Sequence, residues 1–315
     1  MTFARVLTMA AGCLVLAGAA KARQADDPWA PTVVTVTAKY PGPVLWKAVS
    51  GDHVVWILGV PSITSPHAAW DSRRVEGLVS GAEAVYVPPT AAGGLGTALK
   101  YLSGKGLPGG RTLDGVAAPD DYRAFQALAG RVGLKTADYA HDKPAWAGLR
   151  FRTNVFQKML LPVNAAEGKA IALAKAHAVP VRTIAHLRAD AVIDALGGLS
   201  DAEGQACFGQ LVADAAYTAD RVDAMTAAWT AGDIAGYRRL FDDEPRVGCV
   251  DKAVDQAAIG DKGLNATVAT IGEAMAGTRR SLVILPMRLL IGTADLKARL
   301  QAAGIMLQPP PGLDN

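Results

Sequence analysis

The chain has 315 residues, of which 50% are hydrophobic, and its 32 basic and 29 acidic side chains leave a net charge of +3. This near balance argues against an electrostatic nucleic-acid binder, and the apolar content is that of a folded protein rather than a disordered one. A chain of this length can bury a substantial core in one large domain or two modest ones.

Residues 1–22 have the features of a cleavable signal peptide. Arg5 supplies positive charge ahead of an apolar run, and Ala20-Lys21-Ala22 fits a small-x-small cleavage site. Cys13 would suggest a lipoprotein, but too few apolar residues precede it. We expect cleavage near Ala22 and a periplasmic or secreted protein. The mature chain should have no transmembrane span, because no later apolar run reaches about 18 residues.

The region after the leader begins with a polar lead-in, residues 23–42. Alternating Val and Thr at 32–38 predict a short strand within it. Residues 44–49 and 53–60 then have the pattern of two strands joined by a tight turn at Gly51, which predicts a β-hairpin.

A helix and another strand are predicted to follow the hairpin. Ser65 can cap the helix and Pro66 suits its first turn. The apolar run at 82–89 predicts a buried strand, so the order strand, helix, strand indicates a βαβ unit with parallel strands. Residues 90–110 are rich in glycine but fit neither phosphate-binding pattern, so we expect a loop with one short helix there.

From residue 118 to residue 280 the apolar spacing is mostly helical. Within this region Ser200 and Glu203 have the spacing of a capping box at a helix N-terminus. A later helix over 263–277 is expected to end at Gly277, because glycine commonly follows the last helical turn.

The C-terminal region returns to strands. Residues 281–286 and 305–308 are predicted strands, and Thr293 can cap a helix between them. Strands at both ends of the chain predict an α/β fold in which a central mixed β-sheet carries a large helical insertion between its N- and C-terminal strands. We expect residues 43–315 to form a single domain.

Two cysteines remain after the leader, Cys207 and Cys249. An even pair in an exported protein favours a disulfide bond, and two buried free thiols are the alternative. Neither cysteine has a second Cys or His two to four residues away, so a cysteine-based metal site is not expected.

No pair of histidines lies three or four residues apart, so no helical metal-ligand pair is present. Each histidine is expected at the surface or at a helix end, and His67 in the first turn of the helix after the hairpin. No metal or other cofactor is predicted. The five histidines are His53, His67, His141, His177 and His186.

Other candidate polar residues are few, and none is predicted to be catalytic. Ser62 follows a strand but lacks the G-x-S-x-G pattern of a nucleophile elbow. Arg288 lies between apolar runs, either at the edge of the sheet or facing a pocket. The three acids at 242–244 precede a proline and predict a solvated loop.

Several stretches, taken in order, carry a family resemblance. They are "GPVLWKAVSGDHVVWILGVPSITSP", then "GAEAVYVPP", "KPAWAGLRF", and "LNATVATIGEAMAGTRRSLVILPMRLL". Over roughly residues 43–310 the chain resembles proteins of the TraB/GumN family, which are exported or envelope proteins related to the Tiki metalloproteases and to ChaN-like and erythromycin-esterase-like folds. The resemblance rests on pattern and order more than on rare motifs.

The resemblance implies a divalent-metal hydrolase site in which the metal activates a water. Its parts are a G-T-x-H turn after the early strand, a Glu at the end of the next strand, an Arg-Asn pair opening a late helix and a G-x-G-H turn after the late strand. A further Glu of the family falls near Ala185 in this chain.

The matching positions in this chain carry other residues. The early His position is Ser62, the Glu position is Pro88, and the Arg-Asn pair reads Leu264-Asn265. The late His position is Leu289. The glycine of the early turn is kept as Gly59, and the glycine that follows the late turn is kept as Gly292. The late turn itself reads Pro286-Met287-Arg288-Leu289. Proline and leucine offer no lone pair to a metal, so we expect a family member without the catalytic site.

Our main hypothesis is therefore an exported pseudoenzyme that binds an envelope component, a peptide or a partner protein. Ser62, Asn265 and Arg288 are the candidate ligand-binding residues of its cleft, unless side chains fill that cleft. The alternative is a metal-dependent hydrolase or peptidase with a relocated site, in which His53 or His67 would act with Asp71. A purely structural scaffold in the envelope is a third possibility.

Overall fold

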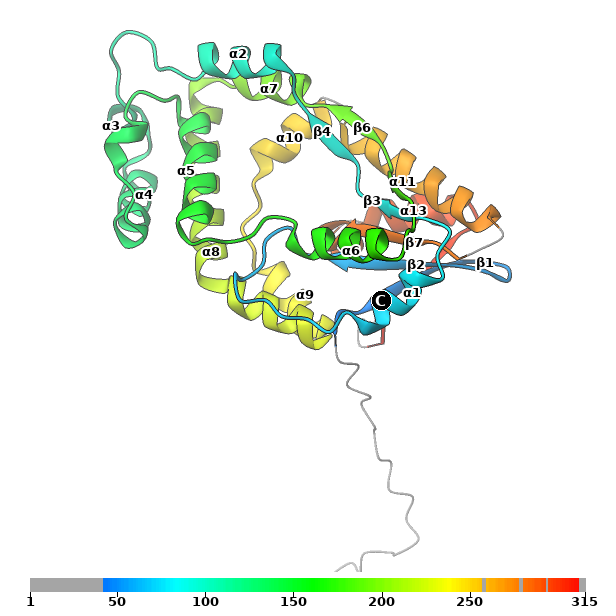
Figure 1. Ribbon diagram of the computed structural model, residues 1–315. Helices are drawn as coiled ribbons and strands as arrows, with labels where there is room; N and C mark the ends of the chain where they lie inside the picture. The colour runs from blue at the N-terminus through cyan, green and yellow to red at the C-terminus, as the bar shows by residue number, and fades with distance from the viewer. Residues whose placement is uncertain (1–41, 257–258, 278–279, 293, 312–315) are drawn as a thin grey trace, which may run out of the picture. The chain divides into compact units, whose positions relative to one another are not determined.

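Six strands of the described residues, 42–256, 259–277, 280–292 and 294–311, form one sheet in the computed structural model (Figure 1). Their order across the sheet is β5-β3-β7-β2-β1-β8. Strands β2, β3, β5 and β7 are parallel, whereas β1 is antiparallel to both β2 and β8. The predicted mixed sheet of N- and C-terminal strands with helices between them is confirmed. The strands are β1 Leu45–Ser50, β2 His53–Val60, β3 Val85–Val87, β5 Val181–Thr183, β7 Leu282–Pro286 and β8 Met306–Gln308.

The β1–β2 hairpin confirms the first structural prediction. Its turn contains Gly51 at φ +55°, a left-handed conformation that glycine adopts without steric cost. The predicted leader, the strand at 32–38 and the capping residue Thr293 lie outside the described residues.

The segment after β2 differs from the prediction. Helix α1, Arg73–Ser80, begins after Ser72 rather than after Ser65, and His67 lies in a turn before it. The Ser65 backbone N–H donates to Thr226 Oγ1 at 2.9 Å, 161 residues away, so a tertiary contact engages the residue that was expected to begin the helix.

The βαβ prediction gave the relative direction of the two strands correctly but did not identify the strand that pairs with both. Strands β2 and β3 are parallel, yet β7 lies between them and pairs with both. A strand that arrives nearly 200 residues later cannot be inferred from the local pattern of the first two.

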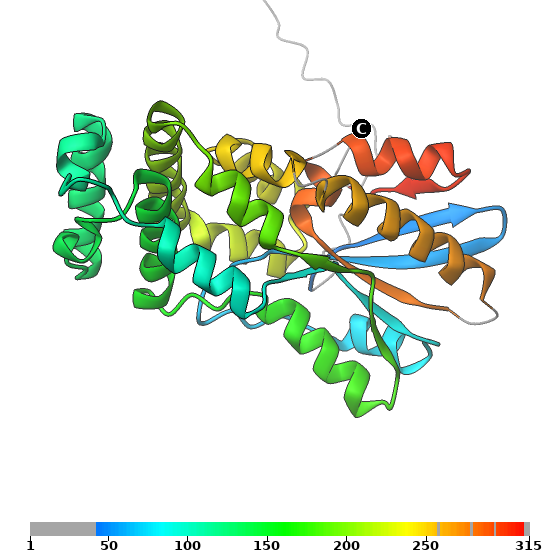
Figure 2. The ribbon, with the colours of Figure 1, turned by 90° about the horizontal axis from the view of Figure 1, so that it is seen from above.

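Helices cover both faces of the sheet (Figure 2). Helices α1 and α6 lie on one face, and α11 and α13 lie on the other. In α13, Leu296 and Leu300 are fully buried against the sheet. The bounds are α6 Ala165–Ala176, α11 Ile259–Ala276 and α13 Ala294–Ala302, and Gly277 follows α11 as predicted.

A second core lies within the helical insertion, where α4, α5 and α8 meet. Phe125 is its centre, with ring centroids 4.6 Å from Phe151 and 5.5 Å from both Tyr139 and Phe208. These helices are α4 Pro119–Val132, α5 Pro144–Lys158 and α8 Asp201–Ala231. The predicted capping box begins α8, because Ser200 N–H donates to Glu203 Oε2 at 3.0 Å and Glu203 N–H donates to Ser200 Oγ at 3.3 Å.

Shorter helices complete the described chain. Those between β3 and β7 are α2 Leu95–Gly104, α3 Leu113–Val116, the 3₁₀ helix η1 Thr136–Tyr139, α7 Asp190–Gly197, α9 Ile234–Asp242 and α10 Gly248–Gln256. Helix α12, Met287–Ile291, directly follows β7. A two-stranded parallel ribbon joins β4 Thr90–Ala92 to β6 His186–Arg188. Of the described helices, none combines the length and apolar run needed to cross a membrane.

Helix α8 connects the two cores. Its 31 residues span about 46 Å, with Phe208 in the insertion core and Trp229 in the sheet core. The Trp229 indole Nε1–H donates to the Gly59 carbonyl at 2.8 Å, and both groups are buried. A Cβ at Gly59 would lie 2.6 Å from both Met287 Sδ and the Trp46 ring, so the end of β2 has no room for a side chain.

The two cysteines form a disulfide bond rather than remaining as free thiols. Cys207 on α8 and Cys249 on α10 are joined, with their Cα atoms 5.4 Å apart and a sequence separation of 42. The bond ties α10 to the long helix.

Replacing Gly59→Ala should lower the free energy of unfolding by about 1–3 kcal/mol, because the methyl group overpacks a filled core. The matched control is Gly77→Ala in α1, where a Cβ meets nothing within 4 Å and should add up to about 1 kcal/mol of stability. Urea unfolding followed by circular dichroism measures both. Equal effects of the two substitutions would contradict this account of the end of β2.

Reducing the disulfide should destabilise the protein by roughly 3–4 kcal/mol, since the bond closes a loop of 42 residues in the unfolded chain. Urea unfolding with and without a phosphine reductant measures the change in a chain that begins at Arg23. A Cys207→Ala, Cys249→Ala double variant should not respond to the reductant. Two titratable thiols in the denatured, unreduced protein would refute the bond.

Candidate functional site

A cavity of about 640 Å³ lies where β2, β3 and β7 end. Carboxyl ends of parallel strands meet at one edge of a sheet, and such edges are where α/β folds place their ligands. We call it the sheet-edge cavity. Its walls include Ser62, Pro88, Leu187, Leu264, Arg288 and Leu289.

The loop that carries Ser62 is held by the segment before α6. The Ser62 carbonyl accepts a hydrogen bond from Asn164 N–H at 2.9 Å, and Thr64 N–H donates to the Pro162 carbonyl at 3.3 Å. Ile63 forms an antiparallel bridge with Val163. This backbone pairing fixes the Ser62 position although the residue itself is exposed.

The positions that the family resemblance implies converge on this cavity. Ser62, Pro88, Leu264 and Leu289 come from four different segments of the chain, and all four line it. Gly292 lines it too, and a Cβ there would lie 2.7 Å from the Phe241 ring. Residues more than 200 positions apart in sequence therefore share one site.

Two of the predicted positions lie elsewhere. Asn265 is exposed on α11, where its Oδ1 accepts a hydrogen bond from Arg299 Nη1 at 2.6 Å, and it is not among the cavity's wall residues. Ala185 lies between β5 and β6, and its carbonyl accepts from Thr90 N–H at 2.9 Å. Of the three predicted cleft residues, the structure therefore brings together Ser62 and Arg288.

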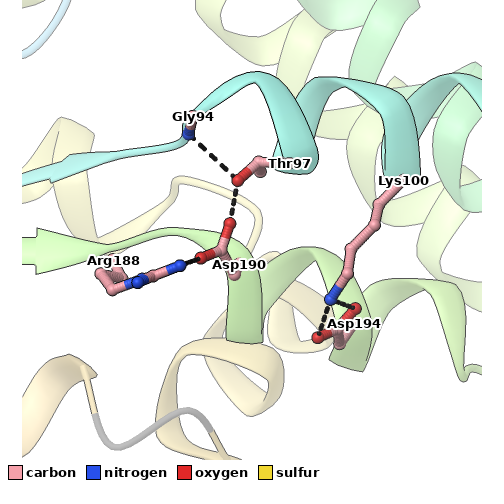
Figure 3. A network of polar contacts seen from close by, with 6 residues as sticks. All are labelled: Gly94, Thr97, Lys100, Arg188, Asp190 and Asp194. Atoms are coloured by element: carbon pink, nitrogen blue, oxygen red, sulfur yellow. Dashed lines mark hydrogen bonds and ion pairs between the residues drawn. The ribbon is translucent and has the colours of Figure 1, made fainter.

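The β4–β6 ribbon forms another wall through Ala91 and Leu187. The helices that follow its strands, α2 and α7, are joined by polar contacts (Figure 3). The Thr97 hydroxyl donates to Asp190 and accepts from Gly94 N–H at 3.2 Å. Lys100 Nζ forms an ion pair with Asp194 at 2.8 Å. These contacts hold the ribbon in place beside the cavity.

Arg288 faces the cavity rather than the sheet's edge, which decides between the two readings of that residue. Its Nη2 lies 3.5 Å from Glu244 Oε1, a long ion pair in which the Glu244 side chain is only 16% exposed. Burial raises the pKa of the Glu244 carboxyl, and the positive charge of Arg288 opposes that shift.

Sequence reasoning missed Glu244. Asp242 and Asp243 are exposed, as the solvated-loop prediction requires, but Glu244 turns inward after α9. Phe241 beside it packs under Arg288, whose guanidinium carbon lies 5.9 Å from the ring centroid. In the sequence, the aromatic residue Phe241 next to the acids 242–244 was the feature that could have indicated a partly buried cluster.

A smaller cavity of about 340 Å³ adjoins the first and shares Ser62, Glu244 and Arg288 with it. It extends between α5, α8 and α9, so we call it the insertion cavity. Arg152 and Asp214 line it, and the Arg152 Nε–H donates to Asp214 Oδ2. Asp214 is 1% exposed.

The histidines do not assemble into a site. His53 begins the eight-residue strand β2 and Ser62 follows its other end, roughly 25 Å away. Asp71 pairs with Arg73 instead, whose hydrogen bonds lower the Asp71 pKa to about 2. His177 Nε2 lies 3.1 Å from Glu76 Oε1. Within the described residues, no three His, Cys, Asp or Glu side chains are grouped closely enough to hold a metal ion.

Comparison with known proteins gives one match. The model of the TraB/PrgY/gumN family matches residues 44–309, which is most of the chain and includes every strand and helix that lines the two cavities. No significant match was found among curated proteins or among solved structures. The match covers well over half of the sequence, and the chain belongs to the TraB/PrgY/gumN family.

Proposed function

We propose that the chain is an exported, catalytically inactive member of its family that binds an organic ligand in the sheet-edge cavity. One observation carries this proposal. Four of the positions to which the resemblance assigns the family's metal-binding and catalytic groups line a single cavity, and there the chain carries Ser62, Pro88, Leu264 and Leu289.

These residues do not fit a divalent metal. Hydrolase metals need imidazole or carboxylate donors in a fixed geometry, and this set offers one hydroxyl oxygen. Asp242, Glu244, Asp251 and Asp295 also line the cavity, but no three of the described acids and histidines converge on one point. Glu244 is already paired with Arg288. We therefore assign no metal-dependent step to this site.

The walls suit a partly apolar ligand. Three leucines and three prolines line the cavity alongside charged residues, and the Arg288–Glu244 pair supplies charge at the junction with the insertion cavity. A few placed polar groups in an apolar pocket are typical of sites that bind small organic molecules or peptide segments. The ligand class we propose is an amphiphilic envelope component or a peptide.

Export is the other half of the proposal. The predicted signal peptide at 1–22 supports it, and so does the Cys207–Cys249 disulfide, because such bonds persist mainly outside the reducing cytosol.

Metal content tests catalytic inactivity. The protein, incubated with Zn²⁺, Mn²⁺ and Co²⁺ and then desalted, should retain far less than one metal ion per chain by elemental mass spectrometry. Retention of about one ion per chain would overturn the proposal. Loss of that ion in a His53→Ala or His67→Ala variant would favour the relocated hydrolase site.

Binding of an amphiphilic dye tests the cavity itself. Anilinonaphthalene sulfonate should bind to the folded protein, and Leu264→Gln should weaken its affinity about tenfold by making one apolar wall polar. The matched control is Leu99→Gln, since Leu99 is 57% exposed on α2 and lies outside the cavity. Fluorescence titration measures both. Equal affinities for the two variants would place dye binding elsewhere.

A further inference from the structure

The insertion cavity contains a buried carboxylate with one oxygen unused. Asp214 Oδ2 accepts a hydrogen bond from Arg152, but Asp214 Oδ1 has no hydrogen-bond partner among the residues that the structure describes. The side chain is 1% exposed and lines the cavity wall. A buried, charged acceptor without a partner is unfavourable. This oxygen itself has almost no accessible surface, so it would gain a partner when the side chain turns to meet a donor in the adjoining cavity.

Several other groups that can accept hydrogen bonds line the same cavity. Thr218 and Tyr237 carry hydroxyl groups, which both donate and accept, and Glu244 and Asp251 add two further carboxylates. A ligand atom that donates several hydrogen bonds and carries positive charge would satisfy this set better than a single hydroxyl would.

Positive charge is present as well. Arg152 and Arg288 both line the cavity, together with the acids Asp214, Glu244 and Asp251. Arg288 is 48% exposed, and its only described ion pair is the long contact with Glu244. Its guanidinium is therefore accessible to a carboxylate or a carbonyl oxygen.

Apolar side chains complete the wall. Leu149, Val222, Met225 and Val250 line the same cavity, which at about 340 Å³ is within the range of small-molecule sites. Opposite charges beside an apolar surface match a molecule that has an ammonium group, a carbonyl or carboxylate, and an apolar side chain close together.

We propose that the insertion cavity binds an α-amino acyl unit with an apolar side chain. Its ammonium group donates to Asp214 Oδ1, and its carbonyl or carboxylate oxygen accepts from Arg288. A free amino acid and the N-terminal residue of a peptide share this chemistry. The inference rests on the insertion cavity alone and does not require the family site to be inactive.

Isothermal titration calorimetry tests the proposal with three probes: L-leucine, the tripeptide Leu-Gly-Gly and N-acetyl-L-leucine. At least one of the first two should bind with a Kd below 1 mM, and which of them binds tighter separates a free amino acid from a peptide N-terminus. N-acetyl-L-leucine lacks the ammonium group and should bind at least a hundredfold more weakly.

Asp214→Asn should weaken binding of the better probe at least tenfold, because the side chain keeps its shape and loses its charge. The matched control, Asp223→Asn, changes an exposed acid on the same helix and should leave the affinity within twofold. Circular dichroism checks that each variant folds. If Asp214→Asn does not fold, Thr218→Val removes a neighbouring hydroxyl and should weaken binding several-fold.

Three results would overturn the proposal: no heat of binding for either probe up to 10 mM, equal affinity for N-acetyl-L-leucine, or unchanged affinity in Asp214→Asn. Leu264→Gln separates this inference from the proposed function. That substitution alters the sheet-edge cavity only, so it should weaken dye binding and leave leucine binding within twofold.

Discussion

The buried hydrogen bond from Trp229 to the Gly59 carbonyl is the contact on which the arrangement of both cavities depends. It joins the end of the long helix α8 to the end of β2, at a point where the core leaves no space for a Cβ. Since α8 also carries Phe208 in the insertion core, this contact fixes the insertion relative to the sheet edge. The same helix carries Asp214, so the position of the insertion cavity follows from it.

Packing constrains some positions of the site and leaves others open. Gly59 and Gly292 each lie where a Cβ would collide with neighbouring atoms, which explains on packing grounds why glycine stands at both positions. Ser62, Pro88 and Leu289 stand at positions that packing leaves open to a cavity. Packing in the folded state therefore restricts the residue type at the two glycine positions. At the other three positions, only a role in binding or catalysis would restrict it. That contrast is consistent with the binding function proposed above.

Local sequence patterns predicted the hairpin, the capping box at Ser200 and the mixed sheet, because each depends on residues close in sequence or on strand order. The predicted start of α1 was wrong because Ser65 N–H forms a hydrogen bond with Thr226 Oγ1 instead of beginning the helix. The position of β7 between β2 and β3 was not predicted. Both depend on distant parts of the chain. For the site, the resemblance supplied the Ser62 position, and the place of a charged residue between apolar runs supplied Arg288. It gave no sign that Asn265 would pair with Arg299, or that Glu244 would turn inward beside Arg288.

Anomalous X-ray scattering at the zinc edge, from a crystal equilibrated with Zn²⁺ and the dye, tests the central claim most directly. The account predicts density for the dye against Leu264 and Leu289 in the sheet-edge cavity, with no anomalous peak there. An anomalous peak in that cavity, coordinated by Glu244 or its neighbouring acids, would contradict the account and restore the reading of the chain as a metal-dependent hydrolase.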